Sequence, residues 1–145
     1  MAAYEVCVVG MPAYRSMSGV WPGFNVPAAD PNLDYNYPLA INASYHYLLP
    51  LFFSKATEQQ KAQVETTYAN NLAKYSKNVS QDIIARSEAR GAEVAEIIWN
   101  YAKTDVIGHE HYLNPFQGYD WREHTSSVGH WVPTFPGPGE AMGGV

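Results

Sequence analysis

The sequence has few of the features that mark several common protein classes. Its single cysteine, Cys7, can form no intrachain disulfide and no cysteine-based metal site. Because Cys7 lies in the apolar run Val6–Val9, we predict an inert buried thiol rather than a reactive one. The longest apolar stretch, Tyr47–Phe53, contains Pro50 and falls far short of the roughly 20 residues that a membrane span needs. We therefore expect no membrane span.

Charged residues are also scarce. They make up 16% of the chain, and 9 Lys and Arg residues stand against 14 Asp and Glu residues, which leaves a net charge of −5. No stretch gathers Lys and Arg, so we expect no nucleic-acid partner. Aromatic residues are plentiful at 14%, led by 11 Tyr and 4 Trp, and the hydrophobic share of 46% allows a core. At 145 residues the chain fits one domain or part of a larger one.

Ser80–Asp105 has the clearest periodicity in the chain. Its small and apolar residues recur at steps of three and four, which places them on one face of a helix. Arg90 and Glu93 fall on other faces and can pair weakly. Gly91 lies in the middle of this face, where glycine destabilises a helix by about 1 kcal/mol relative to alanine. A close helix–helix approach would explain why glycine occurs there. We predict a central core helix against which the other helices pack. The apolar face consists of Ile83, Ile84, Ser87, Gly91, Val94, Ala95, Ile98, Tyr101 and Ala102.

Two shorter helices are expected nearer the start of the chain. Ala2–Val9 is predicted to be helical and to end before the following glycine and proline. The next helix begins at Pro38, because proline suits the first helical position. Pro50 lacks an amide hydrogen and is expected to kink this helix or end it near Leu49.

A third helix is predicted from Thr57 to about Ser76. Thr57 and Gln60 have the spacing of a capping box, in which both side chains satisfy free amides at a helix start. Pro and Gly are frequent in Ala13–Asp34 and again after Asp105, so these stretches are predicted to be loops. The sequence therefore predicts an all-α fold, a portion of a helical bundle with long Pro/Gly-rich loops.

Candidate metal ligands lie in the last third of the chain. His109 and His111 are two residues apart, so both imidazoles would face one way in an extended segment. A metal site would need a third ligand, such as His124, Asp120 or Glu123. Because the spacing matches no established motif, we favour structural or surface histidines. A metal-dependent hydrolase using His109, His111 and His124 is kept as the weaker alternative.

Three groups of residues together resemble a known family. In their order and spacing they are similar to the N-terminal helical region of the vanadium-dependent haloperoxidases, which belong to the type 2 phosphatidic acid phosphatase superfamily. The first group joins Tyr4 and Glu5 to Met11–Ser16 and the Ala-rich stretch Ala40–Tyr45, the second is Ser87–Ile98 followed by Asp105, and the third is Gly129–Gly137.

The resemblance implies an all-α fold and, in a complete protein, halide oxidation on bound vanadate or phosphate-ester hydrolysis by a catalytic histidine. Family members hold the oxyanion through Lys-x6-Arg-Pro, Pro-Ser-Gly-His and Ser-Arg-x5-His motifs. None of these motifs occurs here, and Ser127–His130 has an inserted Val and lacks the Pro. We therefore assign no catalytic residue and no cofactor to this chain, and expect residues 1–145 to be the N-terminal portion of a larger domain.

The same resemblance implies what would complete the protein. The expected partner is a missing C-terminal catalytic portion or a second chain, with a homo-oligomer as a further possibility, and vanadate would belong to the complete protein. Trp131, Pro133 and Thr134 are the candidates for a substrate-channel wall. The family also implies an exported or periplasmic bacterial protein.

The alternative is a helical binding module without enzymatic activity. In that reading, aromatic residues on the loops grip a ligand or a partner. The residues concerned are Trp21, Phe24, Tyr112, Phe116 and Trp121.

Overall fold

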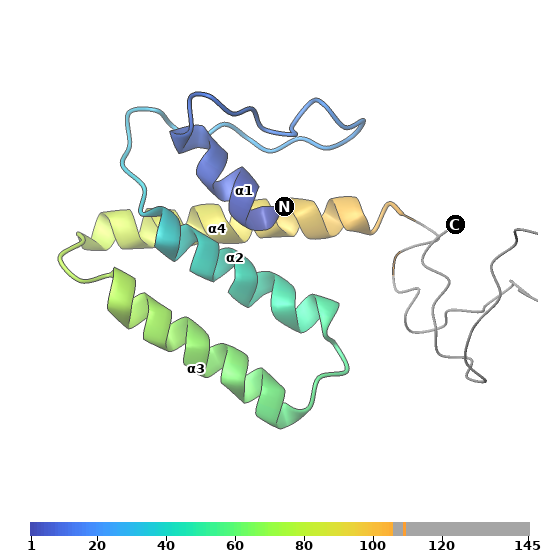
Figure 1. Cartoon of the computed structure of the whole chain (residues 1–145), viewed down its shortest axis with the longest axis vertical. Helices are drawn as coiled ribbons and strands as arrows, with labels where there is room; N and C mark the ends of the chain where they lie inside the picture. Colours follow the sequence, from blue (N-terminus) through green and yellow to red (C-terminus); the bar gives the residue numbers. More distant parts are fainter. Residues whose placement is uncertain (106–108, 110–145) are drawn as a thin grey trace, which may run out of the picture. The chain divides into compact units, whose positions relative to one another are not determined.

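The computed structural model describes residues 1–105 and 109, and this part of the chain contains four α-helices and no strand (Figure 1). The helices are α1 (Ala2–Cys7), which continues as a 3₁₀ turn over Val8–Gly10, α2 (Tyr37–Phe52), α3 (Glu58–Tyr75) and α4 (Gln81–Ala102). They belong to one compact unit, Met1–Ala102. The all-α prediction is confirmed for these residues. None of the helices described here is both long and apolar enough to cross a membrane.

The helix at the centre of this unit is α2, not α4 as predicted. It packs against α4, α3 and α1, whereas the backbone of α3 lies close to α2 only and reaches α4 through the Tyr68 side chain (Figure 1). The reason is the small-residue stretch near its start: Ala40, Ala43 and Ser44 are buried and let neighbouring helices approach. The shared core lies where α1, α2, α4 and the first loop meet. It contains Ala2, Val6, Phe24, Ala40, Leu48, Val94, Ala95 and Ile98.

The packing of α4 on α2 depends on Gly91. A Cβ built at Gly91 would overlap the carbonyl oxygen of Ala40 and would lie 2.8 Å from its carbonyl carbon. The predicted close approach of two helices is thus confirmed. Arg90 pairs with Glu93 as predicted, donating a hydrogen bond at 2.8 Å, and its side chain is only 7% exposed although it lies off the apolar face. Arg90 is adjacent to Gly91 in sequence, and close packing at that glycine brings its neighbour out of solvent.

The helix α2 begins at Tyr37, one residue before the predicted start, and ends beyond the predicted end. The side chain of Asn36 caps the helix by accepting a hydrogen bond from the backbone N–H of Leu39 at 3.1 Å. Pro50 lies inside the helix, which continues to Phe52. Proline removes one hydrogen bond there, but the next turn closes because the N–H of Phe53 donates to the carbonyl of Leu49 at 2.9 Å.

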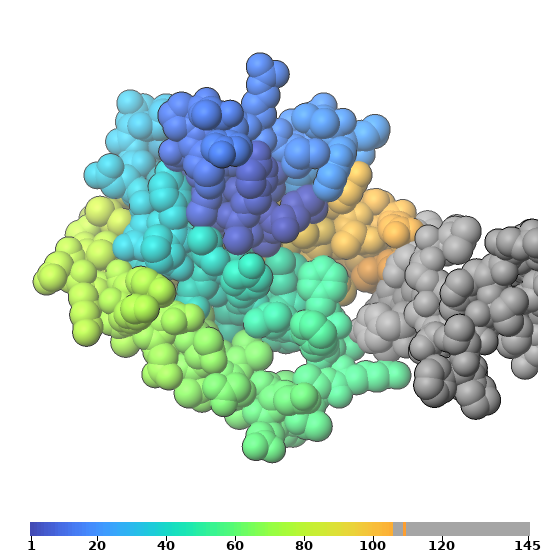
Figure 2. Space-filling model, in the orientation of Figure 1, coloured from blue at the N-terminus to red at the C-terminus, as the bar shows by residue number. Residues whose placement is uncertain are grey.

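The capping box at the start of α3 is confirmed. The backbone N–H of Gln60 donates to Thr57 Oγ1 at 3.3 Å, and the N–H of Thr57 donates to Gln60 Oε1 at 2.9 Å. The helix ends at Tyr75, one residue before the predicted end. No residue of α3 is fully buried, and Figure 2 shows this helix along one edge of the unit.

The loop between α1 and α2 is held down by a buried carboxylate. Glu5 is 1% exposed, and its two oxygens accept hydrogen bonds from Ser16 Oγ at 2.6 Å and from the backbone N–H of Met17 at 2.8 Å. Phe24 is fully buried in the core. In the alternative prediction of a binding module, Trp21 and Phe24 of this loop grip a ligand. Burial removes Phe24 from that role, and Trp21 stacks on Tyr101.

Candidate functional site

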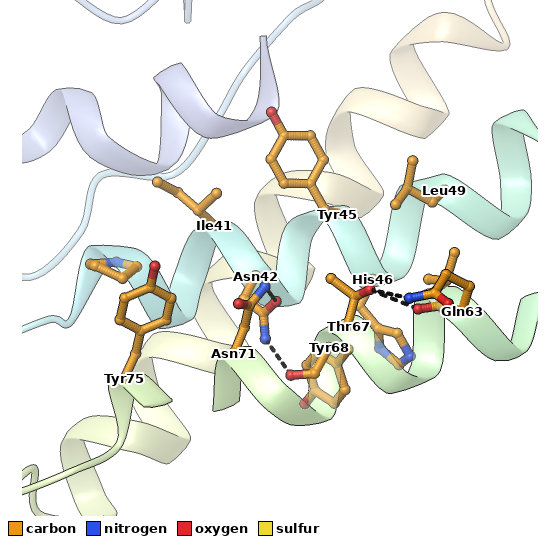
Figure 3. Close-up of a pocket in the computed structure, with 12 residues that line it drawn as sticks. Ile41, Asn42, Tyr45, His46, Leu49, Gln63, Thr67, Tyr68, Asn71 and Tyr75 are labelled. Atoms are coloured by element: carbon orange, nitrogen blue, oxygen red, sulfur yellow. Dashed lines mark hydrogen bonds between the residues drawn. The ribbon is translucent and has the colours of Figure 1, made fainter. Parts of the chain in front are cut away.

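A groove of about 530 Å³ lies between α2 and α3 (Figure 3). The helix α3 packs along one side of α2 and has no fully buried residue, which leaves the space between the two helices partly open. The α2 side chains that line it are Pro38, Ile41, Asn42, Tyr45, His46 and Leu49. The α3 side chains are Gln63, Val64, Thr67, Tyr68, Asn71 and Tyr75.

An apolar row runs along the α2 side of the groove. Ile41, Tyr45 and Leu49 are four residues apart, so they lie one above another on the helix (Figure 3). Tyr45 is 48% exposed, which leaves much of its ring open to a guest. The row gives the groove a mainly apolar wall.

Asparagine amides connect the two helices inside the groove. The Asn42 amide donates to the backbone carbonyl of Tyr68 at 3.0 Å and accepts from the Asn71 amide at 3.0 Å. Asn36 donates to the carbonyl of Tyr75 at 3.2 Å. Two of these bonds use backbone carbonyls near the middle and end of α3, and the third joins two side chains. Together they set the distance of α3 from α2.

His46 lines the groove and contacts α3 through polar and ring contacts. Its Nε2 lies 2.9 and 3.0 Å from the two carboxylate oxygens of Glu65. Its ring stacks on the ring of Tyr68, with centroids 4.0 Å apart and planes 12° from parallel. The Tyr68 hydroxyl in turn donates to Glu88 on α4. Four side chains from three helices thus form a continuous chain.

The contact with the Glu65 carboxylate orients the imidazole of His46 towards α3. The hydrogen bond to Glu88, together with partial burial and the nearby negative charges, raises the pKa of Tyr68 to about 12. Tyr68 therefore keeps its proton at neutral pH and acts there as a donor.

The groove suits an apolar or neutral guest better than an anion. Its lining contains no Lys or Arg, so only a protonated His46 would offer a positive charge to a phosphate-like group. Aromatic and aliphatic side chains supply most of the wall, as in small-molecule sites.

Two further polar groups outside the groove were considered as reactive sites, the Cys7 thiol and the Arg90 guanidinium. Burial raises the pKa of the Cys7 thiol, which is half-buried rather than fully buried as predicted. A raised pKa keeps sulfur in its less nucleophilic thiol form. The Nε of Arg90 is buried and has no hydrogen-bond partner among the described residues.

Most of the site residues predicted from the sequence lie outside the described residues. These are Trp131, Pro133, Thr134, His111 and His124. The aromatic loop residues Tyr112, Phe116 and Trp121 also lie outside the described residues. His109 is described, and its backbone N–H donates to the carbonyl of Asp105 at 2.8 Å. Within residues 1–105 and 109, no group of three His, Cys, Asp or Glu side chains could hold a metal ion. The metal alternative stays a prediction.

Sequence reasoning missed His46 because nothing near it in the sequence resembles a catalytic motif. Its carboxylate partner lies 19 residues away on another helix. The available signal was the spacing of Asn42 and His46, which places two polar side chains on one side of an otherwise apolar helix.

Comparisons of the chain with protein-family models, with curated proteins and with solved structures find no match.

Proposed function

We propose that this chain is the N-terminal helical portion of a protein like the vanadium haloperoxidases and type 2 phosphatidic acid phosphatases. In this proposal it supplies scaffold and substrate access and is not catalytic alone. Vanadate and the oxyanion-binding residues belong to a C-terminal portion or to a second chain. Trp131, Pro133 and Thr134 contribute to the wall of the substrate channel.

One observation carries the proposal: residues of the resembling segments pair with one another in the fold. Gly91, from the second segment, packs against the backbone of Ala40, from the first. These positions are far apart in the sequence and lie at a close approach of α4 to α2. A shared spacing of such residues supports a shared helix packing, which is what a scaffold requires.

The same holds for the start of the chain. The Tyr4 hydroxyl donates to the carbonyl of Arg15 at 2.6 Å, and Glu5 accepts from Ser16 at 2.6 Å. These four residues all belong to the first resembling group. Their contacts are structural, which supports a scaffold role for this portion.

The test begins with every polypeptide present in material purified from the native source. We expect a product carrying Lys-x6-Arg-Pro and Pro-Ser-Gly-His, either continuous with this chain or bound to it. That material should oxidise bromide with peroxide in the presence of vanadate, or hydrolyse phosphate esters with inhibition by vanadate. The 145-residue chain alone, at 16.1 kDa, should do neither. A native source that yields only this chain, inactive in both assays, would contradict the proposal.

The second candidate, a binding module, is favoured by the groove between α2 and α3. Its largely apolar lining suits a small apolar ligand. In this case the isolated chain should bind an apolar fluorescent probe, and Tyr45→Ala should weaken that binding. Native material that contains only the 145-residue chain and binds such a probe would favour this function over the first.

A further inference from the structure

We propose that the groove between α2 and α3 binds a linear, uncharged amphiphile, a single hydrocarbon chain with a neutral polar head, lying parallel to the two helices. The inference rests on the second candidate function, the binding module, and names the class of its ligand. It follows from the shape of the groove, from its apolar walls and from the charges beside its two ends.

The groove is long relative to its volume. Its lining extends from Pro38 to Leu49 on α2 and from Gln63 to Tyr75 on α3. At the rise of an α-helix, these stretches span about 16–18 Å. A volume of about 530 Å³ spread over that length gives a mean cross-section of about 30 Å². An extended chain fills such a narrow space better than a compact ring system with the same number of carbon atoms.

The apolar walls follow the same direction. Ile41, Tyr45 and Leu49 recur every four residues, so their side chains form a row along α2 (Figure 3). On the opposite wall, Val64 and Tyr68 of α3 are also four residues apart. A hydrocarbon chain between the two rows contacts apolar side chains over its whole length. Because each methylene group removed from water strengthens binding by up to about fourfold, a chain gains affinity from every carbon that the rows cover.

A charged group lies beside each end of the groove, and each already has a partner. Towards the Gln63 end, the Glu65 carboxylate lies 2.9 Å from Nε2 of His46. At the other end, the ammonium of Lys74 donates to the Tyr75 hydroxyl at 3.3 Å and lies 4.7 Å from the centre of its ring. The described lining residues themselves include no Lys, Arg, Asp or Glu. A charged guest would find no free counter-charge in the groove, and a charge buried without a partner is unfavourable.

Neutral hydrogen-bonding groups are available for the head of the ligand. The Gln63 amide nitrogen donates to Thr67 Oγ1 at 3.4 Å, and its side-chain oxygen has no hydrogen bond among the described residues. The same is true of the Tyr45 hydroxyl on the opposite wall. These groups can bond to an uncharged hydroxyl, ester or amide.

The experiment compares three probes with equal numbers of carbon atoms. These are 1-decanol, which is linear and uncharged, decanoate, which is linear and anionic, and 1-adamantanol, which is compact and uncharged. Their binding to the full chain is measured by isothermal titration calorimetry at neutral pH. We expect 1-decanol to bind about fivefold or more tightly than decanoate, because the carboxylate has no free partner in the groove. The same margin is expected over 1-adamantanol, which covers less of the two apolar rows.

A matched pair of variants locates the binding. Thr67 lines the groove, so Thr67→Trp places a large ring in it and should weaken 1-decanol binding about tenfold or more. Thr66→Trp is the control, because Thr66 is an exposed neighbour outside the lining. Both threonine hydroxyls donate to the carbonyl four residues earlier in α3, at 2.9 Å for Thr66 and 2.7 Å for Thr67. The two variants therefore lose the same kind of bond, and circular dichroism should show that both keep their helices.

The outcomes separate the ligand class from the binding function. Decanoate that binds as tightly as 1-decanol, and more weakly to Lys74→Gln, would show a carboxylate ligand and overturn the uncharged head. Equal binding of 1-adamantanol would overturn the linear shape. In both cases the binding-module function would stand, because a ligand still occupies the groove.

Two other outcomes would remove the binding function together with this inference. One is that none of the three probes binds, or that Thr67→Trp leaves the binding of 1-decanol unchanged. The other is a dimer in sedimentation velocity that Thr67→Trp dissociates and Thr66→Trp does not, since a second copy of the chain would then fill the groove. We expect the unmodified chain to sediment as a monomer with and without 1-decanol.

Discussion

Gly91 determines how closely α4 can lie to α2. Its missing side chain leaves room for the backbone of Ala40, and no larger residue fits without moving one helix. The glycine is thus needed for its small size in the middle of a helix, where it would otherwise be unfavourable.

Gly91→Ala should therefore destabilise the protein despite the better helix propensity of alanine. We expect the free energy of unfolding to fall by about 1–3 kcal/mol, since overpacking outweighs the gain in propensity. Urea denaturation followed by circular dichroism measures this change. Glu96→Ala, at an exposed position of the same helix, should stay within about 0.5 kcal/mol of the unmodified protein. A neutral or stabilising Gly91→Ala would contradict the packing described here.

Glu5 fixes the first loop through its two hydrogen bonds. Glu5→Ala leaves the Ser16 hydroxyl and the Met17 amide without their partner, which should cost about 2 kcal/mol or more and free the loop. Trypsin cleavage after the exposed Arg15 should then become faster. Glu5→Gln retains an acceptor for Met17 and should have a smaller effect. Equal cleavage rates in all three proteins would show that Glu5 does not hold the loop.

The helix α3 combines a well-defined start with weak tertiary packing. Its capping box satisfies amides locally, so the helix is specified by its own sequence. Its connection to α4 consists of the hydrogen bond from Tyr68 to Glu88, which also raises the pKa of Tyr68. The stability of this connection therefore depends on pH in the alkaline range.

Tyr68→Phe should reveal that dependence. The folded state holds the Tyr68 proton more tightly than the unfolded state, so the hydrogen bond contributes fully below about pH 10 and is lost as the pH rises through about 12. The stability difference between the unmodified chain and Tyr68→Phe should therefore shrink towards zero over this interval. Denaturant titrations at a series of pH values provide the measurement. Tyr45→Phe, whose hydroxyl has no hydrogen bond among the described residues, should show no such trend.

The compact unit Met1–Ala102 is built in two levels. The α1, α2 and α4 helices share the buried core, and α3 adds to it from one side through α2 (Figure 1). Such an arrangement separates global unfolding from a partial opening in which only α3 leaves.

Native-state hydrogen exchange at increasing denaturant should resolve the two processes. Amides of α2 and α4 should exchange together through global unfolding, and amides of α3 should exchange at a lower free energy with a smaller denaturant dependence. If the α3 amides follow the same curve as α4 at every denaturant concentration, the unit opens as a whole and the two-level description is wrong.

Local features of the fold were predictable from the sequence because they depend on nearby residues. The capping box of Thr57 and Gln60 and the small face around Gly91 fall into this group. The end of α2 was not predictable, because Pro50 is tolerated where the next turn closes through Phe53 and Leu49. The candidate site was missed for a similar reason: His46 and Glu65 meet only after two helices pack.

The sequence by itself determined that the described residues form helices, where most of them begin, and which glycine permits close packing. These properties follow from periodicity and from hydrogen bonds between residues a few positions apart. Only the tertiary structure decided that α2 is the central helix, that Arg90 and Glu5 are buried, and that His46 faces a carboxylate. Those outcomes depend on contacts between residues far apart in the chain, and a linear pattern contains no distance between them.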